Sequence, residues 1–203
     1  MTEFLLIRHA LTDAADRWYA GRMPGIDLND RGRRDAATLA RRLENITFDA
    51  IYSSPLERCL ETAELIAKLQ DVEVEVDHAF IEIDCGDWTG KPFGELRQDP
   101  SFGCFGTFRC GTRPPNGELL LEVQSRVVAA VLRLAERYPQ KTIGIVSHSD
   151  PIKSVLAYFL GIPPDLASRL VTAPASISIL DLEESDAKVK LINHTGPLGM
   201  LEL

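Results

Sequence analysis

The 203-residue sequence predicts a three-layer α/β/α sandwich with a mostly parallel central sheet. The first observation is that short apolar runs alternate with segments whose apolar residues recur at helical spacing, a pattern typical of α/β folds. The second is that three apolar runs, at 3–7, 49–53 and 142–146, lead into arginine, serine or histidine. The carboxyl ends of parallel strands meet at one edge of the sheet, where such folds bind ligands.

The remaining elements follow from the same two periodicities. Segment 72–76 alternates apolar and acidic residues, which is typical of an edge strand. Helical spacing of apolar residues predicts helices around 36–43, across 118–137 and from 151 to 160, and two last strands are expected at 176–182 and 189–193.

A further helix is expected to begin at Ser54-Pro55. A hydroxyl residue commonly caps a helix, and proline is favoured at the first helical position. Arg58 would then lie about one turn into this helix, close enough to reach the end of the preceding strand.

Segment 91–117 shows no periodicity and is rich in glycine and proline. We expect it to form a long loop, or lid, over the top of the sheet, within a single domain that spans residues 1–203. Loops of this kind commonly carry specificity. Phe102, Phe105 and Phe108 within it would form either an apolar lid over a substrate or the contact of a homodimer.

Composition restricts the partners and the compartment. The formal net charge is −8, and 45% of residues are hydrophobic and 26% charged. This balance argues against binding to nucleic acid or to an anionic membrane surface. The amino terminus has four consecutive apolar residues, too few for a signal peptide or a membrane span. We therefore expect a cytoplasmic protein with reduced thiols at Cys104 and Cys110.

Two arginines and two histidines follow the predicted strands at the same edge of the sheet. Arg8 and Arg58 suit a phosphate, because a guanidinium pairs with two oxygens at once and keeps its proton. An imidazole attacks phosphorus only when it is neutral, and cationic neighbours disfavour its protonation. His9 is therefore the expected nucleophile, and His148 the expected donor to the developing charge.

A leaving alkoxide also needs a proton, which a carboxyl group could supply and later take back from water. Glu82, Asp84 and Asp87 all lie in one segment after the edge strand. The chemistry of the residues alone does not choose among the three.

Four sequence blocks resemble the histidine phosphatase superfamily, which includes the phosphoglycerate mutases. Leu6-Ile7-Arg8-His9 resembles its Arg-His-Gly signature, and Ser147-His148 its second histidine. Segment 53–63 is similar to its Ser-Ser-Pro-x-x-Arg-x-x-x-Thr-Ala block, and segment 82–90 to its Glu-x-x-x-Gly-x-Trp-x-Gly block. The blocks occur in the family's order over roughly residues 4–182, a combination that chance rarely produces.

The resemblance implies roles for individual residues. His9 would carry the phosphoryl group, Arg8, Arg58 and His148 would bind it, and Glu82 would be the acid and base. Neither a metal nor a cofactor would be needed. Positions that line the substrate site in this family correspond to Thr12, Gly21, Arg22 and Ser149.

The sequence departs from the family at several positions. Ala10 replaces the usual glycine after the first histidine, and Ala15 stands where many members have asparagine. Asp150 also lies beside the expected site. An aspartate there would repel an anionic substrate unless it turned away or paired with an arginine.

Three functions remain open. The first is a phosphomonoester hydrolase that acts through a phosphohistidine on a small phosphorylated metabolite. The second is a cofactor-dependent phosphoglycerate mutase, which would share every catalytic residue, but the Glu-Arg-His-Tyr-Gly pattern of the mutases is missing and the expected loop is not strongly basic. The third is an inactive homologue that only binds phosphorylated ligands, which the intact set of core residues disfavours.

Overall fold

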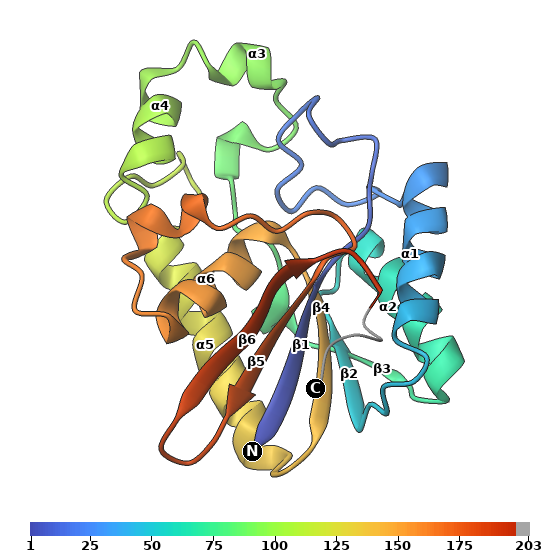
Figure 1. Cartoon of the computed structure of the whole chain (residues 1–203). Coiled ribbons are helices and arrows are strands. Elements are labelled where there is room, and N and C mark those ends of the chain that lie inside the picture. The colour runs from blue at the N-terminus through green and yellow to red at the C-terminus, as the bar shows by residue number, and fades with distance from the viewer. Residues whose placement is uncertain (198–203) are drawn as a thin grey trace.

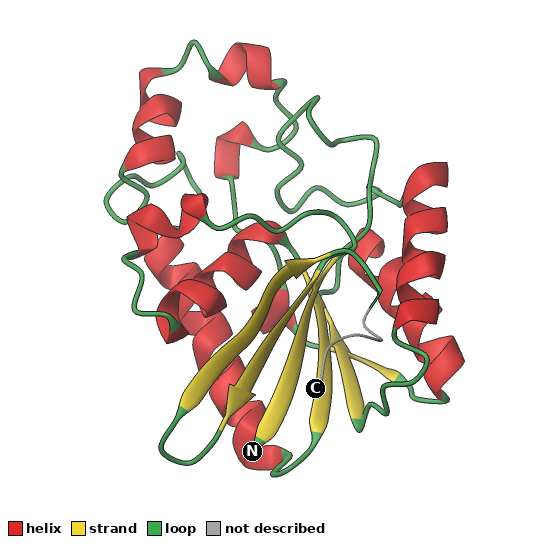
Figure 2. Cartoon of the chain, viewed as in Figure 1, coloured by secondary structure: helices red, strands yellow, loops and turns green. Residues whose placement is uncertain are grey.

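A computed structural model describes residues 1–197. Figure 1 shows a twisted sheet with helices on both faces, and Figure 2 shows the same view by secondary structure. The strands are β1 (Thr2–Arg8), β2 (Ala50–Ser53), β3 (Val74–Val76), β4 (Thr142–Ser147), β5 (Ile177–Leu182) and β6 (Ala187–His194). The helices are α1 (Asp30–Arg42), α2 (Glu57–Gln70), α3 (Phe93–Leu96), α4 (Pro100–Thr107), α5 (Leu120–Arg137) and α6 (Ser149–Phe159). Short 3-10 helices are η1 (His78–Phe80), η2 (Gly86–Trp88) and η3 (Pro164–Arg169).

The six strands are ordered β3-β2-β4-β1-β5-β6. β4 pairs in parallel with β1 and with β2, and β2 pairs in parallel with β3. β5 runs antiparallel to β1, and β6 antiparallel to β5. The predicted α/β sandwich with a mostly parallel sheet is therefore confirmed.

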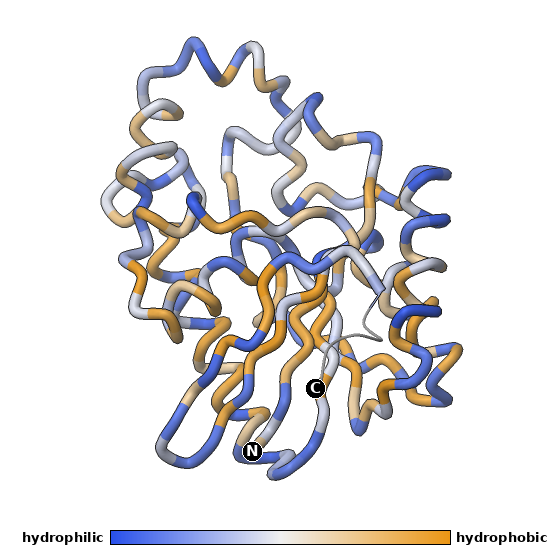
Figure 3. Tube along the Cα trace, viewed as in Figure 1, coloured by the Kyte–Doolittle hydropathy of each residue, from blue (hydrophilic) through white to orange (hydrophobic). Residues whose placement is uncertain are grey.

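The sheet separates two apolar layers, because successive side chains of a strand point to opposite faces. On β1, Phe4 and Leu6 pack into the layer beneath α5 and α6. Leu5 and Ile7 pack into the other layer, beneath α1 and α2. All four side chains are at most 2% exposed. Figure 3 shows the hydrophobic residues concentrated in the strands between the helical layers.

The carboxyl ends of the parallel strands meet, as the sequence predicts. Arg8 at the end of β1 lies opposite Ser147 at the end of β4, and Ser53 of β2 lies opposite Val146. The first residues beyond these strands stay in register, because the His9 amide donates to the Ser147 carbonyl oxygen at 2.9 Å. Side chains just beyond these strands are therefore held at one edge of a buried sheet.

The expected start of α2 is wrong. The helix begins at Glu57, and its capping residue, Leu56, makes no side-chain hydrogen bond to the helix. The Ser54 hydroxyl instead lies 2.7 Å from Nε2 of His148, and only a long 3.4 Å contact joins it to the Leu56 amide. Ser54 thus belongs to the site, and Arg58 is the second residue of the helix.

Segment 91–117, predicted as an irregular loop, contains α3 and α4. α4 begins with a recognisable signal, because the Asp99 carboxylate accepts from the Ser101 amide at 2.9 Å and Pro100 occupies the first turn. Phe102 and Phe105 lie three residues apart on one face of α4, and their rings each pack 5.3 Å from the Trp88 ring. In Figure 1 this segment lies beyond the carboxyl ends of the strands.

Several further boundaries differ from those expected, the largest being the start of α1 at Asp30, six residues before Ala36. β3 spans three residues, not five, and α6 begins at Ser149, two residues before Pro151. Within residues 1–197, none of the helices combines the length and the apolar character that crossing a bilayer requires.

A pair of glycine substitutions tests the packing of α1 against the chain that follows β1. A Cβ atom at Gly32 would collide with the backbone carbonyl of Leu11. We expect Gly32→Ala to lower the free energy of unfolding by about 2–3 kcal/mol, because backbone cannot move aside as a flexible side chain can. Denaturant unfolding measures this.

The matched control is Gly103→Ala on α4, where a Cβ atom would have nothing within 4 Å. We expect that substitution to be neutral or to stabilise by up to about 1 kcal/mol, because alanine favours helix. Equal effects of the two substitutions would contradict the packing described.

Candidate active site

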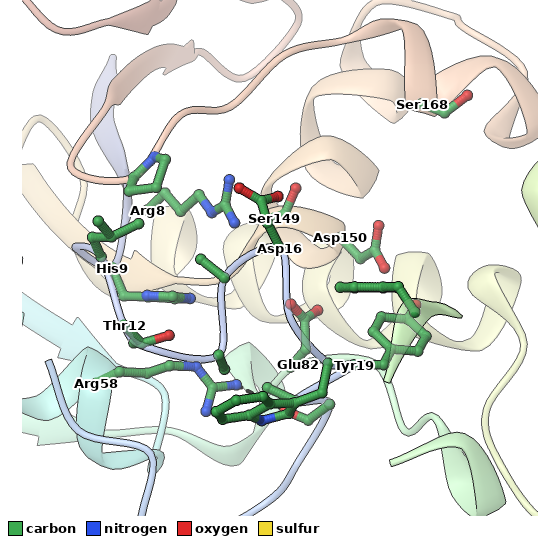
Figure 4. Close-up of a pocket in the computed structure, with 18 of the residues that line it drawn as sticks. Arg8, His9, Thr12, Asp16, Tyr19, Arg58, Glu82, Ser149, Asp150 and Ser168 are labelled. Carbon is green, nitrogen blue, oxygen red and sulfur yellow. Dashed lines mark hydrogen bonds between the residues drawn. The ribbon is translucent and has the colours of Figure 1, made fainter. Parts of the chain in front are cut away.

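A cavity of about 440 Å³ opens at the carboxyl edge of the sheet. Six stretches of chain far apart in sequence build its walls. These are the end of β1 with the chain after it, the start of α2, the loop between η1 and η2, the α3–α4 segment, the start of α6 and the segment from η3 to β5. The residues that line it include Arg8, His9, Thr12, Trp18, Tyr19, Gly21, Arg58, Glu82, Phe93, Phe102, Phe105, Arg109, Ser149 and Asp150. Figure 4 shows Arg8, His9 and Arg58 grouped together, with Glu82 and Tyr19 farther along the cavity.

One tautomer of His9 is selected by the backbone carbonyl of the next residue, Ala10. Nδ1 lies 2.7 Å from the carbonyl oxygen of Ala10. A carbonyl oxygen can only accept, so Nδ1 carries the proton of the neutral ring and Nε2 keeps its lone pair. Burial and the charges of Arg58 and Arg8 lower the pKa of His9 well below 6.5. The structure therefore favours a neutral imidazole with a free Nε2.

Thr62 on α2 holds Ala10, the residue whose carbonyl oxygen selects this tautomer. Its hydroxyl accepts from the Ala10 amide at 3.2 Å and donates to the Arg58 carbonyl at 2.7 Å. The side chain has no solvent exposure. The sequence analysis gave Thr62 no role, although it lies in the quoted block that contains Arg58.

Arg58 extends from the first turn of α2 into the cavity and is 2% exposed. One terminal nitrogen, Nη2, donates to the Gly21 carbonyl at 2.7 Å. The other, Nη1, is buried and has no hydrogen-bond partner among residues 1–197. A buried donor without a partner is costly, so its presence beside a cavity favours an anionic ligand.

Arg8 is oriented from the opposite wall. Its Nη1 donates to the carbonyl oxygen of Thr172, and its Nε is buried without a partner in the described part of the chain. Together with Arg58 it gives this end of the cavity two cations and donors that are not yet used.

His148 lies behind His9 and does not line the cavity. It precedes the first residue of α6 and has no exposed surface. Its ring meets the His9 ring at a centroid distance of 5.1 Å and an angle of 63°. Burial and the neighbouring cation Arg58 lower the pKa of His148 well below 6.5. Its predicted contact with a phosphoryl group stays a prediction.

The structure separates the three candidate acids. The loop between η1 and η2 brings Glu82 to the cavity wall, where one carboxylate oxygen accepts from the Ile83 amide at 2.9 Å. The Asp84 carboxylate accepts from the Gly86 amide, and that of Asp87 from the Asn116 side chain, so both serve the local loop.

The ionisation of Glu82 is strongly perturbed. Desolvation, helped by the nearby charge of Asp150, raises the pKa of Glu82 to about 7. A carboxyl group with such a pKa exchanges protons readily at neutral pH.

The predicted substrate-binding residues divide into two groups. Thr12, Gly21 and Ser149 line the cavity, and the Ser149 hydroxyl lies 3.1 Å from that of Thr172. Arg22 is not among the residues that line the cavity, and its predicted contact with a substrate stays a prediction. Its Nε donates to the Glu82 carbonyl at 2.8 Å and its Nη2 to Glu118 at 2.8 Å. Arg22 thus supports the backbone of the loop that carries Glu82.

Asp150 pairs with an arginine that the sequence analysis did not assign to the site. Both terminal nitrogens of Arg109 donate to the two Asp150 oxygens, at 2.7 and 2.8 Å. Burial alone would raise the pKa of Asp150, but the Arg109 guanidinium outweighs it and holds that pKa below its usual value. The repulsion anticipated for Asp150 is therefore offset within the cavity.

The cysteines and the acidic residues form no further centre in the part of the chain described. All four cysteines are free, Cys104 and Cys110 included. Within residues 1–197, no group of three histidine, cysteine or acidic side chains is placed to hold a metal ion.

These features define an α/β protein with a cavity at the carboxyl edge of its sheet, lined by two arginines and a histidine. A sequence model of the histidine phosphatase superfamily (branch 1) matches residues 4–195. The chain therefore belongs to that superfamily, and the predicted family is confirmed.

Three relatives illustrate the range of similar proteins. Phosphoserine phosphatase 1 of Hydrogenobacter thermophilus is 31% identical over 98% of this chain and 95% of that protein. A 2,3-bisphosphoglycerate-dependent phosphoglycerate mutase of Thermoplasma acidophilum is 30% identical over 77% of this chain and 74% of its own. A solved phosphoserine phosphatase variant of Entamoeba histolytica, in complex with phosphoserine, has a TM-score of 0.87 and 28% identity, and the match covers 98% of this chain and 100% of that one.

The ionisation of His9 can be measured directly. We expect nitrogen NMR to show a neutral ring protonated at Nδ1, with a titration midpoint well below 6.5, because burial and two guanidinium charges oppose protonation. A midpoint at or above 6.5 would contradict the arrangement of charges.

Thr62→Val tests the support of this tautomer. The isosteric change leaves the buried Ala10 amide without its acceptor, so we expect a loss of about 1–3 kcal/mol in the free energy of unfolding. The same spectra should show a second His9 tautomer. Thr62→Ser keeps a hydroxyl and should restore the single tautomer, whereas identical spectra for Val and Ser would refute the role of the hydroxyl.

Proposed function

We propose that the protein is a phosphomonoester hydrolase that acts on a small phosphorylated metabolite through a phosphohistidine at His9. The observation that carries this proposal is the arrangement of Nε2 of His9, held as a free base, beside the donors of Arg8 and Arg58. The similarity to proteins named as phosphatases supports it.

In the first step, Arg8 and Arg58 bind the oxygens of the phosphoryl group. Nε2 of His9 attacks phosphorus, and the bond from phosphorus to the ester oxygen breaks. The guanidinium charges of Arg8 and Arg58, one on each side of the phosphoryl group, stabilise the equatorial oxygens of the transition state. Glu82, in its protonated form, gives its proton to the leaving alkoxide.

In the second step, water enters from the side that the alcohol has left. Glu82, now ionised, takes a proton from this water as its oxygen attacks phosphorus. The bond from phosphorus to nitrogen breaks, and inorganic phosphate leaves. A pKa near 7 lets one carboxyl group serve as acid and then as base.

His148 acts together with His9. Its ring contacts the His9 ring edge to face. From there it holds the nucleophile in place, and its contact with the phosphoryl group remains a prediction. The Ser54 hydroxyl, 2.7 Å from Nε2, orients the ring.

The mutase reaction is the nearest alternative, and one relative carries that name. A mutase must hold a donor with a second anionic group while it excludes water. Among the described residues that line the cavity, the third cation, Arg109, is already paired with Asp150. Because Arg109 is thus not free to hold the second anionic group of a donor, this pairing favours hydrolysis over the mutase reaction. An inactive homologue is disfavoured, because His9, Arg8, Arg58 and Glu82 are all brought together.

The cytoplasmic location, the homodimer and the lack of nucleic-acid partners stay predictions of the sequence. So does the division of the chain into one domain with a lid at 91–117.

His9→Ala is expected to lower kcat/KM for p-nitrophenyl phosphate by at least about 10³-fold, because it removes the nucleophile. The control is His78→Ala, which removes an exposed histidine outside the cavity and should leave turnover unchanged. Turnover that survives in His9→Ala, or absence of turnover by the wild-type protein, would contradict the proposal.

The pH dependence of kcat/KM should report the proton on Glu82. For an alkyl phosphate, activity should fall as pH rises through about 7, because the acid is then ionised. The negative charge of Asp150 helps to keep this proton, so Asp150→Asn should lower the pKa of Glu82 and move the alkaline limb to lower pH. A limb that stays in place or moves upward would exclude Glu82 as the acid.

A further inference from the structure

The two ends of the cavity differ in chemistry. Arg8, His9 and Arg58 form the end where the phosphoryl group is proposed to bind. The remainder includes five aromatic side chains from two segments far apart in sequence. In Figure 4, Tyr19 and Asp150 lie on the side away from Arg8 and His9. The aromatic lining residues are Trp18, Tyr19, Phe93, Phe102 and Phe105.

The aromatic rings at this end of the cavity pack closely against one another. The Tyr19 ring lies 5.8 Å from that of Phe93 and 6.0 Å from that of Phe102. Trp88, which is 1% exposed, packs from behind against Phe102 and Phe105, each at 5.3 Å. A wall of interlocked rings is preorganised to receive a flat apolar group with little loss of side-chain entropy.

The cation at this aromatic end is neutralised. Both terminal nitrogens of Arg109 are used by Asp150, and the pair is largely buried, with 8% and 14% of the side chains exposed. The guanidinium carbon also lies 4.4 Å above the Phe105 ring. Its Nε has no partner among residues 1–197, but the charge behind that donor is already balanced. A carboxylate placed here would lose its hydration and meet the carboxylates of Asp150 and Glu82, and Arg109, the lining cation at this end, is already paired.

We propose that the Asp150–Arg109 pair determines specificity. It makes the aromatic end of the cavity a site for an uncharged, ring-bearing alcohol and excludes esters whose alcohol carries a carboxylate. The substrate class is thus a phosphate monoester of a neutral aromatic or similarly flat apolar alcohol. This inference rests on the proposed phosphatase activity and adds the identity of the leaving group.

Two synthetic esters test the class. Benzyl phosphate and 4-carboxybenzyl phosphate share the same reacting atoms and differ by one remote carboxylate. We expect kcat/KM of the wild-type protein to be at least about tenfold higher for benzyl phosphate. Glycerol phosphate, which has no ring, should also be the poorer substrate by a similar factor.

Asp150→Asn tests the role of the pair. Without the carboxylate, Arg109 is free to meet the carboxylate of 4-carboxybenzyl phosphate. The ratio of the two kcat/KM values should therefore fall by about tenfold or more, through a gain with the charged ester. The matched control is Glu122→Gln, which removes a charge from the exposed bidentate pair with Arg113 outside the cavity and should leave the ratio unchanged.

The outcomes are distinct. A wild-type protein that prefers the carboxybenzyl ester, or does not distinguish the three esters, overturns the substrate class, while its turnover of p-nitrophenyl phosphate keeps the phosphatase proposal intact. An equal loss with both benzyl esters in Asp150→Asn overturns the role of the pair. No hydrolysis of any ester, p-nitrophenyl phosphate included, overturns both proposals.

A second variant does not require a change to the buried pair. Phe102 is half-buried, and Phe102→Ala removes one ring of the wall. We expect it to lower kcat/KM for benzyl phosphate several-fold more than for glycerol phosphate. An equal effect on the two esters would contradict the aromatic site.

Discussion

One buried and one partly buried guanidinium group, placed beside two imidazoles, impose the constraint on which this site depends. Arg8 and Arg58 each leave a buried donor without a partner in the described residues, and a cavity beside such costly donors offers a place for a ligand that accepts from them. Their charge, together with burial, keeps both histidines neutral. The same charges that would bind an oxyanion therefore also keep the imidazole of His9 ready to attack it.

The fold supports this constraint through α2 and its neighbours. The first turns of this helix supply Arg58, which is directed into the cavity, and Thr62, which binds the amide of Ala10, the residue whose carbonyl oxygen meets Nδ1 of His9. Gly21 accepts from Arg58 with its backbone carbonyl, and a Cβ atom there would crowd Cys85 and Thr89 at 3.1 Å. Positioning of the base and of the anion-binding donors is thus shared by one helix and one strand end.

The sheet and the meeting of its strand ends could be predicted, because local periodicity and the residues after each strand are visible in a single sequence. The role of Ser54 as a helix cap was predicted wrongly, because a hydroxyl before proline resembles such a cap and nothing local shows that His148 binds it. The pairing of Arg109 with Asp150, 41 residues apart, depends on how α4 docks, which periodicity does not report. The start of α4 could have been predicted, because Asp99 followed by Pro100 is a local signal for the beginning of a helix.

The central claim is a covalent intermediate on His9, and a trapping experiment tests it most directly. Glu82→Gln mixed with p-nitrophenyl phosphate should form the intermediate, because nitrophenolate leaves without a proton, and should hydrolyse it slowly, because no base activates water. After an alkaline quench, mass spectrometry should find one phosphoryl group on the peptide that contains His9. An unmodified protein, or a phosphoryl group on another residue, would contradict the account.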